Sequence, residues 1–280
     1  MSLDVSSIGY TTKPYVHEMD WKKAITYALG IGAKRDELDY LYEARGPKVF
    51  PTYGVIPAFE PLVDVVSHVG GGFENLVHGA QSIVVHRPLP PNGTWQTTGK
   101  LKALFDLKRM TQVVATTETR CDDELLFETE WMIILFDLGN FGGPRPTKPV
   151  KVDPPEGKPA DFSVRQLTSP EQALFYRLSG DYNPLHIDAA FAEKLGFKEG
   201  PILHGLCTFG HVARAVIQGA CNGDGDKLKS LSAHFKKPVW PGDELVTDGW
   251  VLESRQCPLN VTVPGKPDAI LGNAFAEIHS

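Results

Sequence analysis

The chain has 280 residues, of which 42% are hydrophobic and 22% are charged, and its formal net charge at pH 7 is −6. This composition is typical of a globular protein, and no run approaches the about 18 consecutive apolar residues that a membrane span needs. The acidic balance argues against a nucleic-acid partner, which requires a basic face, but it leaves room for a local basic pocket that holds a phosphorylated ligand. The length fits either one large domain or two domains of ordinary size.

The cysteines and the two ends of the chain bear on the cellular compartment. The first residues, MSLDVSSIGY, have neither a basic stretch nor an apolar core, so we expect no secretory signal. The chain ends in Ile278-His279-Ser280, which is not a peroxisomal tripeptide, so a peroxisomal address would have to lie on a part of the chain that is not present here. No two cysteines have the spacing of a Cys-x-x-Cys motif, and we expect reduced thiols of an intracellular protein at all four positions: Cys121, Cys207, Cys221 and Cys257.

In the first half of the chain, two strand-like segments flank a short polar turn. They are QVVATTETR at residues 112–120 and LLFETEWMIILF at residues 125–136, and the turn between them is Cys-Asp-Asp-Glu. The second segment ends in the most apolar stretch of the sequence, Trp131 to Phe136, which is typical of a buried strand. The pattern predicts a β-hairpin.

A segment rich in proline and glycine follows this hairpin. Residues 139–159 read GNFGGPRPTKPVKVDPPEGKP, with six prolines and four glycines in 21 residues. Such a segment cannot continue a helix or form a central strand, so we expect an extended connector. The sequence therefore predicts an N-terminal half at residues 1–140, a connector at 141–160 and a C-terminal half at 161–280.

The second half begins with three predicted helices. Ser169-Pro170-Glu171 places an N-cap residue, a proline and an acid at the start of the first helix, and Gly180 ends it. Asp188 caps a second, short helix that ends at Gly196. From Leu206 onward, apolar residues keep helical spacing until Asn222-Gly223, which predicts one long apolar helix. A second β-hairpin is predicted from LNVTV at residues 259–263 and AILGNAFAEI at residues 269–278.

Several patterns occur once in each half. A Pro-x-x-Pro pair at residues 88–91 precedes Asn-Gly and then strands, and a second pair at residues 238–241 precedes Gly-Asp and then strands. An apolar pair followed by His-Gly also occurs twice, at residues 76–79 and 202–205, although the spacing to the proline pairs differs. These repeats predict a diverged internal duplication. Each copy would be an α+β fold in which an antiparallel sheet wraps around a helix.

The stretch 179-SGDYNPLHID-188 carries the first candidate chemistry. Gly180 and the Asn183-Pro184 turn make a rigid loop, so Asp181 and His186 at its two ends can face a common site. A carboxylate and an imidazole that contact the same water can remove its proton and pass a proton to a substrate carbon. The same residues also fit a simpler interpretation, in which the aspartate caps a turn and the histidine is buried.

The second candidate feature is the stretch 200-GPILHGLCTFGHVARAV-216. Gly205 opens the long apolar helix, where backbone N–H groups face outward at the positive end of the helix dipole. Such a group can stabilise a carbonyl oxygen that gains negative charge, although Gly205 could instead be a packing glycine beside a core histidine, His204. An acid–base pair and an oxyanion donor together suit the addition of water to a double bond conjugated with a carbonyl.

These two stretches together resemble the signature of hydratase 2, the (3R)-specific 2-enoyl-CoA hydratases of the MaoC-like hot-dog fold found in peroxisomal multifunctional enzymes. First-half segments such as ITYALGIGA, PTYGVI and LVHGAQ fit the same family, so the resemblance covers nearly the whole chain. It implies an α+β tandem hot-dog fold in which only the second half carries the catalytic loop, because the first half has no Asp-x-Asn-Pro-x-His. The first half would then accommodate the acyl chain.

The resemblance also implies an activity and its setting. Water would add to a trans-2-enoyl-CoA to give a (3R)-3-hydroxyacyl-CoA in peroxisomal β-oxidation. No metal or redox cofactor would be needed, since CoA is part of the substrate. The family further implies a homodimer and fusion to dehydrogenase domains in the full-length protein.

Residue roles carry over from the family motif to matching positions. Asp181 and His186 would bind the catalytic water, Asn183 would order the loop, and the Gly205 N–H would polarise the thioester carbonyl. A further set would bind or support the substrate: His78, Gly79 and Phe235 at the acyl-CoA, Lys108 at a CoA phosphate, and Glu43 as support from the first half.

Other functions remain open at this stage. A hot-dog acyl-CoA thioesterase would use the same fold and a carboxylate-activated water, and it would release free CoA thiol. A non-catalytic acyl-CoA-binding or dimerisation module would bind without turnover. A serine hydrolase is disfavoured because no Gly-x-Ser-x-Gly occurs, and His204 and His211 lack the spacing of a His-Glu-x-x-His zinc site.

Overall fold

The computed structural model describes residues 3–72 and 76–279, which group into two compact units. Unit 1 comprises residues 1–18, 54–87 and 94–151, and unit 2 comprises residues 19–53, 88–93 and 152–280. In the described part of the chain, no helix has both the length and the apolarity to cross a membrane.

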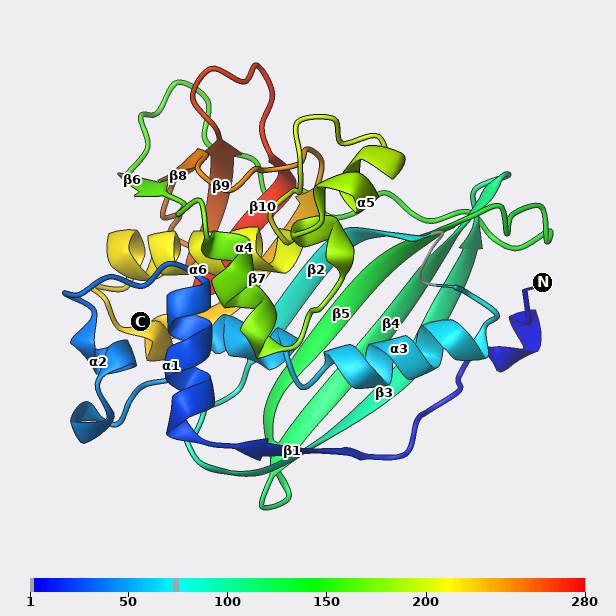
Figure 1. Cartoon of the computed structure of the whole chain (residues 1–280), viewed down its shortest axis with the longest axis horizontal. Helices are drawn as coiled ribbons and strands as arrows, with labels where there is room; N and C mark the ends of the chain where they lie inside the picture. The colour runs from blue at the N-terminus through cyan, green and yellow to red at the C-terminus, as the bar shows by residue number, and fades with distance from the viewer. Residues whose placement is uncertain (1–2, 73–75, 280) are drawn as a thin grey trace. The chain divides into compact units, whose positions relative to one another are not determined.

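Unit 1 is a sheet with one long helix across its face. The strand order is β1-β3-β4-β5-β2, and the pairs β3–β4, β4–β5 and β5–β2 are antiparallel. Helix α3 lies across the sheet (Figure 1); four of its residues are buried, and the helix contacts β4. The elements are η1 (Val5–Ser7), β1 (Tyr15–Met19), α3 (Phe59–His68), β2 (Leu76–Val85), β3 (Gly93–Asp106), β4 (Met110–Cys121) and β5 (Glu124–Phe136).

The first predicted hairpin is confirmed as β4–β5. Cys121 pairs with Glu124, and the two residues between them, Asp122 and Asp123, have φ angles of +49° and +62°. Positive φ at both central residues is typical of the two-residue turns whose twist matches that of the strands. Along β5, Trp131, Ile133 and Leu135 are buried while the alternate residues are not, as expected for a strand with one face in the core.

In unit 2 the strand order is β6-β8-β9-β10-β7, and neighbouring strands pair antiparallel throughout. Its strands are β6 (Phe162–Leu167), β7 (Leu228–Phe235), β8 (Glu244–Gly249), β9 (Gln256–Thr262) and β10 (Leu271–Ile278). The second predicted hairpin is thus confirmed as β9–β10. The helices of the unit are α1 (Trp21–Gly30), α2 (Leu38–Leu41), η2 (Glu43–Arg45), η3 (Pro51–Val55, which extends into unit 1), α4 (Gln172–Tyr176), η5 (Arg177–Ser179), η6 (Pro184–His186), α5 (Ala189–Lys194), α6 (Gly205–Ala220) and η7 (Gly225–Lys227).

Helix α6 is the core of unit 2. Every residue from Leu206 to Ile217 is buried, and the helix packs against β6, β7 and β8 (Figure 1). It ends where the sequence predicts, because Asn222 and Gly223 both adopt positive φ. The predicted short helix is α5, capped by Asp188, whose side chain accepts a hydrogen bond from Phe191 N–H at 2.9 Å. The first predicted helix, α4, starts at Gln172 because the Ser169 hydroxyl closes a turn by accepting from Glu171 N–H before the helix begins.

The two units repeat one topology. In each, a first strand precedes the long helix and a second strand, and the next three strands follow in the same sheet order. This confirms the tandem α+β prediction. The two His-Gly pairs do not correspond, however, since His78-Gly79 lies inside β2 whereas His204-Gly205 lies at the start of α6. Their similarity is therefore not a trace of the duplication.

The units differ in one respect from the predicted halves, because residues 19–53 and 88–93 belong to unit 2. Helix α1 packs on α4 and η5, and the Gln172 side-chain amide donates to the carbonyls of Leu29 and Gly30 at 3.0 and 2.6 Å. The buried Arg214 guanidinium forms a two-pronged ion pair with Glu37 and donates to Ile31 O at 3.0 Å. Contacts between distant segments thus join the N-terminal helices to α6.

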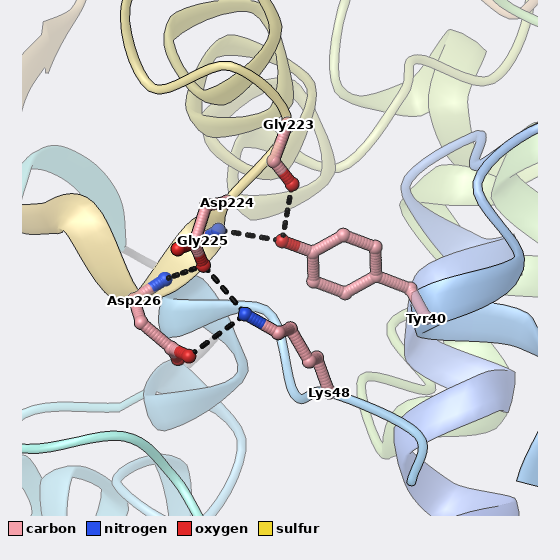
Figure 2. Close-up of polar contacts among 6 residues, drawn as sticks. All are labelled: Tyr40, Lys48, Gly223, Asp224, Gly225 and Asp226. Atoms are coloured by element: carbon pink, nitrogen blue, oxygen red, sulfur yellow. Dashed lines mark hydrogen bonds and ion pairs between the residues drawn. The ribbon is translucent and has the colours of Figure 1, made fainter. Parts of the chain in front are cut away.

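A second junction between these segments is a polar cluster formed by Tyr40, Lys48 and the turn at residues 223–226 (Figure 2). The Tyr40 hydroxyl donates to Gly223 O at 3.0 Å and accepts from Gly225 N–H at 2.6 Å. The Lys48 ammonium contacts Asp224 at 2.6 Å and Asp226 at 2.9 Å. We refer to this group as the Tyr40–Lys48 cluster.

Candidate active site

The loop between η5 and η6 places Asp181 and His186. Gly180 ends η5 with a φ of +129°, a conformation that residues with a Cβ rarely adopt. Asp181 Oδ1 accepts from Asn183 N–H at 3.2 Å, and Asn183 Oδ1 accepts from Leu185 N–H at 3.0 Å. Pro184 then occupies the first position of η6. These two side-chain-to-backbone bonds fix the loop locally, so its shape follows from the sequence of the loop itself.

His186 is held in one tautomer. Its Nδ1 lies 2.9 Å from Ile202 O, and because a carbonyl oxygen only accepts, Nδ1 carries the proton. Nε2 is then a lone-pair acceptor. Burial lowers the pKa of His186, and the Asp181 carboxylate and the Ile202 hydrogen bond oppose this shift without cancelling it. The imidazole is therefore neutral near pH 7, as a general base must be.

The structure brings Asp181 and His186 together. One carboxylate oxygen of Asp181 and one ring nitrogen each from His186 and His204 all lie within 4.8 Å of one another. A water that makes hydrogen bonds of about 2.8 Å to two such atoms fits a separation of this size. The Asp181 carboxylate and the His186 imidazole are thus close enough to share a water, and their binding of a common water stays a prediction.

Gly205 lies at the start of α6, directly after the N-cap residue His204. The N–H groups of the first helical turn have no partner within the helix and lie at the positive end of the dipole. A Cβ at this position would lie 3.3 Å from a ring carbon of Phe235, which is tighter than ordinary van der Waals contact. Glycine therefore leaves the space next to the Phe235 ring free of a side chain at the first residue of α6.

Asp181, His186 and His204 carry groups that can bind metal ions, but the geometry of the two histidines argues against metal binding. The imidazole rings of His186 and His204 are stacked, with centroids 3.7 Å apart and planes inclined by 28°. A metal bound to both rings must lie close to both ring planes at about 2.1 Å from each nitrogen. The two ring planes meet much farther than about 2.1 Å from the ring nitrogens, so one metal ion would not lie close to both planes. The arrangement therefore suits acid–base chemistry better than metal binding.

The remaining predicted residues are spread over both units. In unit 1, His78 stacks on Trp131 at 5.0 Å and contacts Ala80 O at 3.0 Å, and burial lowers its pKa to about 4. Gly79 leaves room for the Met132 methyl group, 2.7 Å from where a Cβ would be.

The other two predicted residues are exposed. Lys108 has a φ of +72°, and Glu43 lies on η2 in unit 2. Their contacts with acyl-CoA stay predictions.

Two neighbours of the loop could not be predicted as site residues from the sequence. His204 entered only as a possible core histidine, yet it stacks on His186. Tyr176 lies with its ring 4.9 Å from that of His204, and its buried hydroxyl has no hydrogen-bond partner among the described residues. The stacked pair joins the N-cap residue of α6 to a loop residue 18 positions earlier, which leaves no periodic signal, so only the structure reveals it.

Two family models match the chain, one in each half. The MFE-2 hydratase 2 N-terminal domain matches residues 17–136, and the MaoC like domain matches residues 151–265. The chain is 36% identical over 280 residues to 3-hydroxyacyl-thioester dehydratase Y of Mycobacterium tuberculosis, covering 96% of this chain and 94% of that protein. It is 33% identical over 284 residues to the mouse peroxisomal multifunctional enzyme type 2, covering 98% of this chain but 38% of the mouse protein.

Solved structures agree with these matches. A MaoC-like dehydratase from Phytophthora capsici superposes with a TM-score of 0.88 at 29% identity, covering 99% of this chain and 98% of that one. A Mycobacterium tuberculosis protein described as a double hot-dog fold superposes with a TM-score of 0.62 at 11% identity, covering 96% of this chain and 95% of that one, which bears on the fold alone. With both halves matched and a relative at 36% identity along its length, the chain belongs to the MaoC-like hydratase 2 family and has its tandem hot-dog fold.

Proposed function

We propose that the protein hydrates a trans-2-enoyl-CoA to a (3R)-3-hydroxyacyl-CoA. The observation that supports this most directly is the convergence of Asp181 and the neutral His186 within 4.8 Å, on a loop next to the first N–H of α6. The names of the relatives point to the same reaction class, since one is a 3-hydroxyacyl-thioester dehydratase and family members are hydro-lyases. The (3R) configuration is taken from the family.

In the proposed mechanism, a water lies between the Asp181 carboxylate and Nε2 of His186. As the water oxygen bonds to C3 of the substrate, Nε2 accepts one water proton, and the Asp181 charge stabilises the imidazolium that forms. The electron pair of the double bond moves toward the thioester carbonyl, whose oxygen accepts a hydrogen bond from Gly205 N–H. The imidazolium then returns its proton to C2. Because one group removes and returns the proton, both new bonds form on one face of the alkene.

The experiment that tests this function measures two products in one reaction. With a trans-2-enoyl-CoA, hydration removes the enoyl absorbance while the thioester stays intact, and chiral analysis identifies the (3R) product. A thioesterase instead releases CoA thiol, which a thiol reagent detects. A non-catalytic acyl-CoA-binding module binds the thioester and turns over neither bond, and either of these results would overturn the proposal.

Substitution of the two central residues tests the mechanism. Asp181→Ala and His186→Ala should each lower kcat by at least the about 10²-fold that general acid–base catalysis contributes, while the circular dichroism spectrum stays that of the wild type. A variant that keeps wild-type turnover would remove its residue from the mechanism.

We further propose the setting of the reaction. Hydration neither oxidises nor reduces the substrate, so the residues of the chain can catalyse this reaction without a metal or redox cofactor. The relatives named peroxisomal multifunctional enzyme type 2 and peroxisomal hydratase-dehydrogenase-epimerase support a role as the hydratase part of a longer peroxisomal enzyme with a dehydrogenase part. A homodimer remains the assembly expected for the family, and sedimentation velocity would test it.

A further inference from the structure

We propose that His204 is a positioning residue that holds His186 and Asp181 in their reactive arrangement through one face and one edge of its ring. This inference deepens the hydratase function proposed above and rests on it. His204 is the N-cap residue of α6, directly before Gly205, the predicted oxyanion donor, and its side chain makes no capping hydrogen bond. One buried side chain would thereby link the base and the carboxylate residue.

The contacts of His204 are of two separable kinds. Its ring stacks on that of His186, with centroids 3.7 Å apart and an interplanar angle of 28°. Its Nε2 lies 3.3 Å from Asp181 O, the backbone carbonyl of the carboxylate residue. The stack restrains the plane of the His186 ring, whereas the Ile202 hydrogen bond restrains only its edge. The Nε2 contact restrains the backbone from which the Asp181 carboxylate extends.

The protonation state of His204 follows from these contacts. A carbonyl accepts only, so Nε2 carries the proton, and Nδ1 has no partner among the described residues. Burial lowers the pKa of His204 to about 2; the neighbouring His186 and Arg177 act in the same direction, and the hydrogen bond to Asp181 O opposes the shift without cancelling it. His204 therefore stays neutral at any pH at which the enzyme would work. It cannot replace His186 as the base, and its neutral ring shields one face of His186 from water.

A matched pair of variants separates the two contacts. His204→Phe keeps a flat ring against His186 and removes the Nε2 donor, and His204→Gln keeps an N–H donor near the position of Nε2 and removes the ring. The control is His211→Phe, because His211 is a buried histidine within α6, with no hydrogen-bond partner for either ring nitrogen in the described part of the chain. The groups that face His186 are Asp181 and His204, with Arg177 beside His204, and all three variants leave the charged ones unchanged.

The expected result is a change in kcat with a pH signature. A misplacement of reacting groups by about 1 Å costs up to about 10²-fold, so we expect both His204 variants to lose about 10- to 100-fold in kcat with little change in KM. In His204→Gln, water reaches His186 and raises its pKa, so the acidic limb of the kcat–pH profile moves to higher pH. In His204→Phe the ring remains and the limb stays in place. His211→Phe should change neither quantity.

Two outcomes would overturn the inference. The first is wild-type kcat in both His204 variants. The second is an unshifted acidic limb of the kcat–pH profile in His204→Gln, which is the result expected if His204 only fills space in the core. If the variants do not fold, NMR of the wild-type protein with ¹⁵N-labelled histidine decides, because the inference requires a neutral His204 with the proton on Nε2 from pH 5 to 8. A protonated ring or an Nδ1–H tautomer contradicts it. Since NMR needs no turnover, its result stands apart from the hydratase assay, whose failure with wild-type protein would refute the proposed function instead.

Discussion

The Tyr40–Lys48 cluster allows a quantitative test of the interactions that join residues 19–53 to the rest of unit 2 (Figure 2). In Tyr40→Phe, the ring keeps its place against Phe50, 3.8 Å away, and only the hydroxyl is lost. Tyr40 is 3% exposed, and its hydroxyl is the partner of the buried Gly225 N–H and of Gly223 O. Burial is the main cause that raises the pKa of this hydroxyl, so it stays protonated at any ordinary pH.

The loss of unfolding free energy in Tyr40→Phe depends on whether each former partner of the hydroxyl can bond to water instead. Gly223 is exposed, so water can replace the hydroxyl at its carbonyl, but Gly225 is buried and its N–H is left without a partner. A buried donor without a partner costs about 1–3 kcal/mol, so Tyr40→Phe should lower the free energy of unfolding by about 2 kcal/mol. Lys48→Met removes two ion pairs whose side chains are 36–37% exposed, and screening by solvent limits their combined contribution to about 1 kcal/mol or less.

Urea denaturation of both variants measures these losses, and amide hydrogen exchange at Gly225 reports on the turn itself. The effect of Lys48→Met should shrink in about 1 M salt, because the Debye length falls to about 3 Å, whereas that of Tyr40→Phe should not. If Tyr40→Phe changes the free energy of unfolding by less than about 0.5 kcal/mol, like an ordinary surface substitution, the reasoning is wrong. A larger loss for Lys48→Met than for Tyr40→Phe would contradict it equally.

Three further predictions concern the site and the core. Gly205→Ala places a Cβ beside the predicted oxyanion donor, and steady-state assays should show kcat reduced by about 10²-fold with the fold retained. Asp181→Asn removes the negative charge that raises the pKa of His186, so the acidic limb of its residual kcat–pH profile should move to lower pH; an upward shift would exclude this electrostatic role. Glu37→Gln leaves the Arg214 guanidinium, 2% exposed, without its carboxylate and should cost about 3–5 kcal/mol in chemical denaturation, while Glu37→Leu/Arg214→Met should cost less than the single substitution.

Much of the candidate site could be predicted because its loop is built from short-range interactions. The positive φ of Gly180, the two hydrogen bonds around Asn183, and the Asp188 cap all join residues two or three positions apart. Turn and cap preferences depend on such neighbours, so the sequence expresses them directly. The same reason explains why the hairpins and the ends of α5 and α6 lie where the pattern predicts.

The features that could not be predicted depend on contacts between segments far apart in the sequence. Residues 19–53 join unit 2 because Arg214 and Gln172 bond to a segment more than 140 residues earlier in the chain. The recurrence of His-Gly suggested two equivalent positions, but one pair lies in a strand and the other opens a helix.

The sequence by itself determined the tandem α+β architecture and the Asp181–His186 loop, since hydrophobic periodicity, caps and turns act over a few residues. The tertiary structure alone decided that His204 stacks on His186 and that α1 packs on α4 and η5. Contacts of that kind depend on side-chain shape and hydrogen-bond geometry between segments that meet only after folding, and no local pattern encodes which partners will meet.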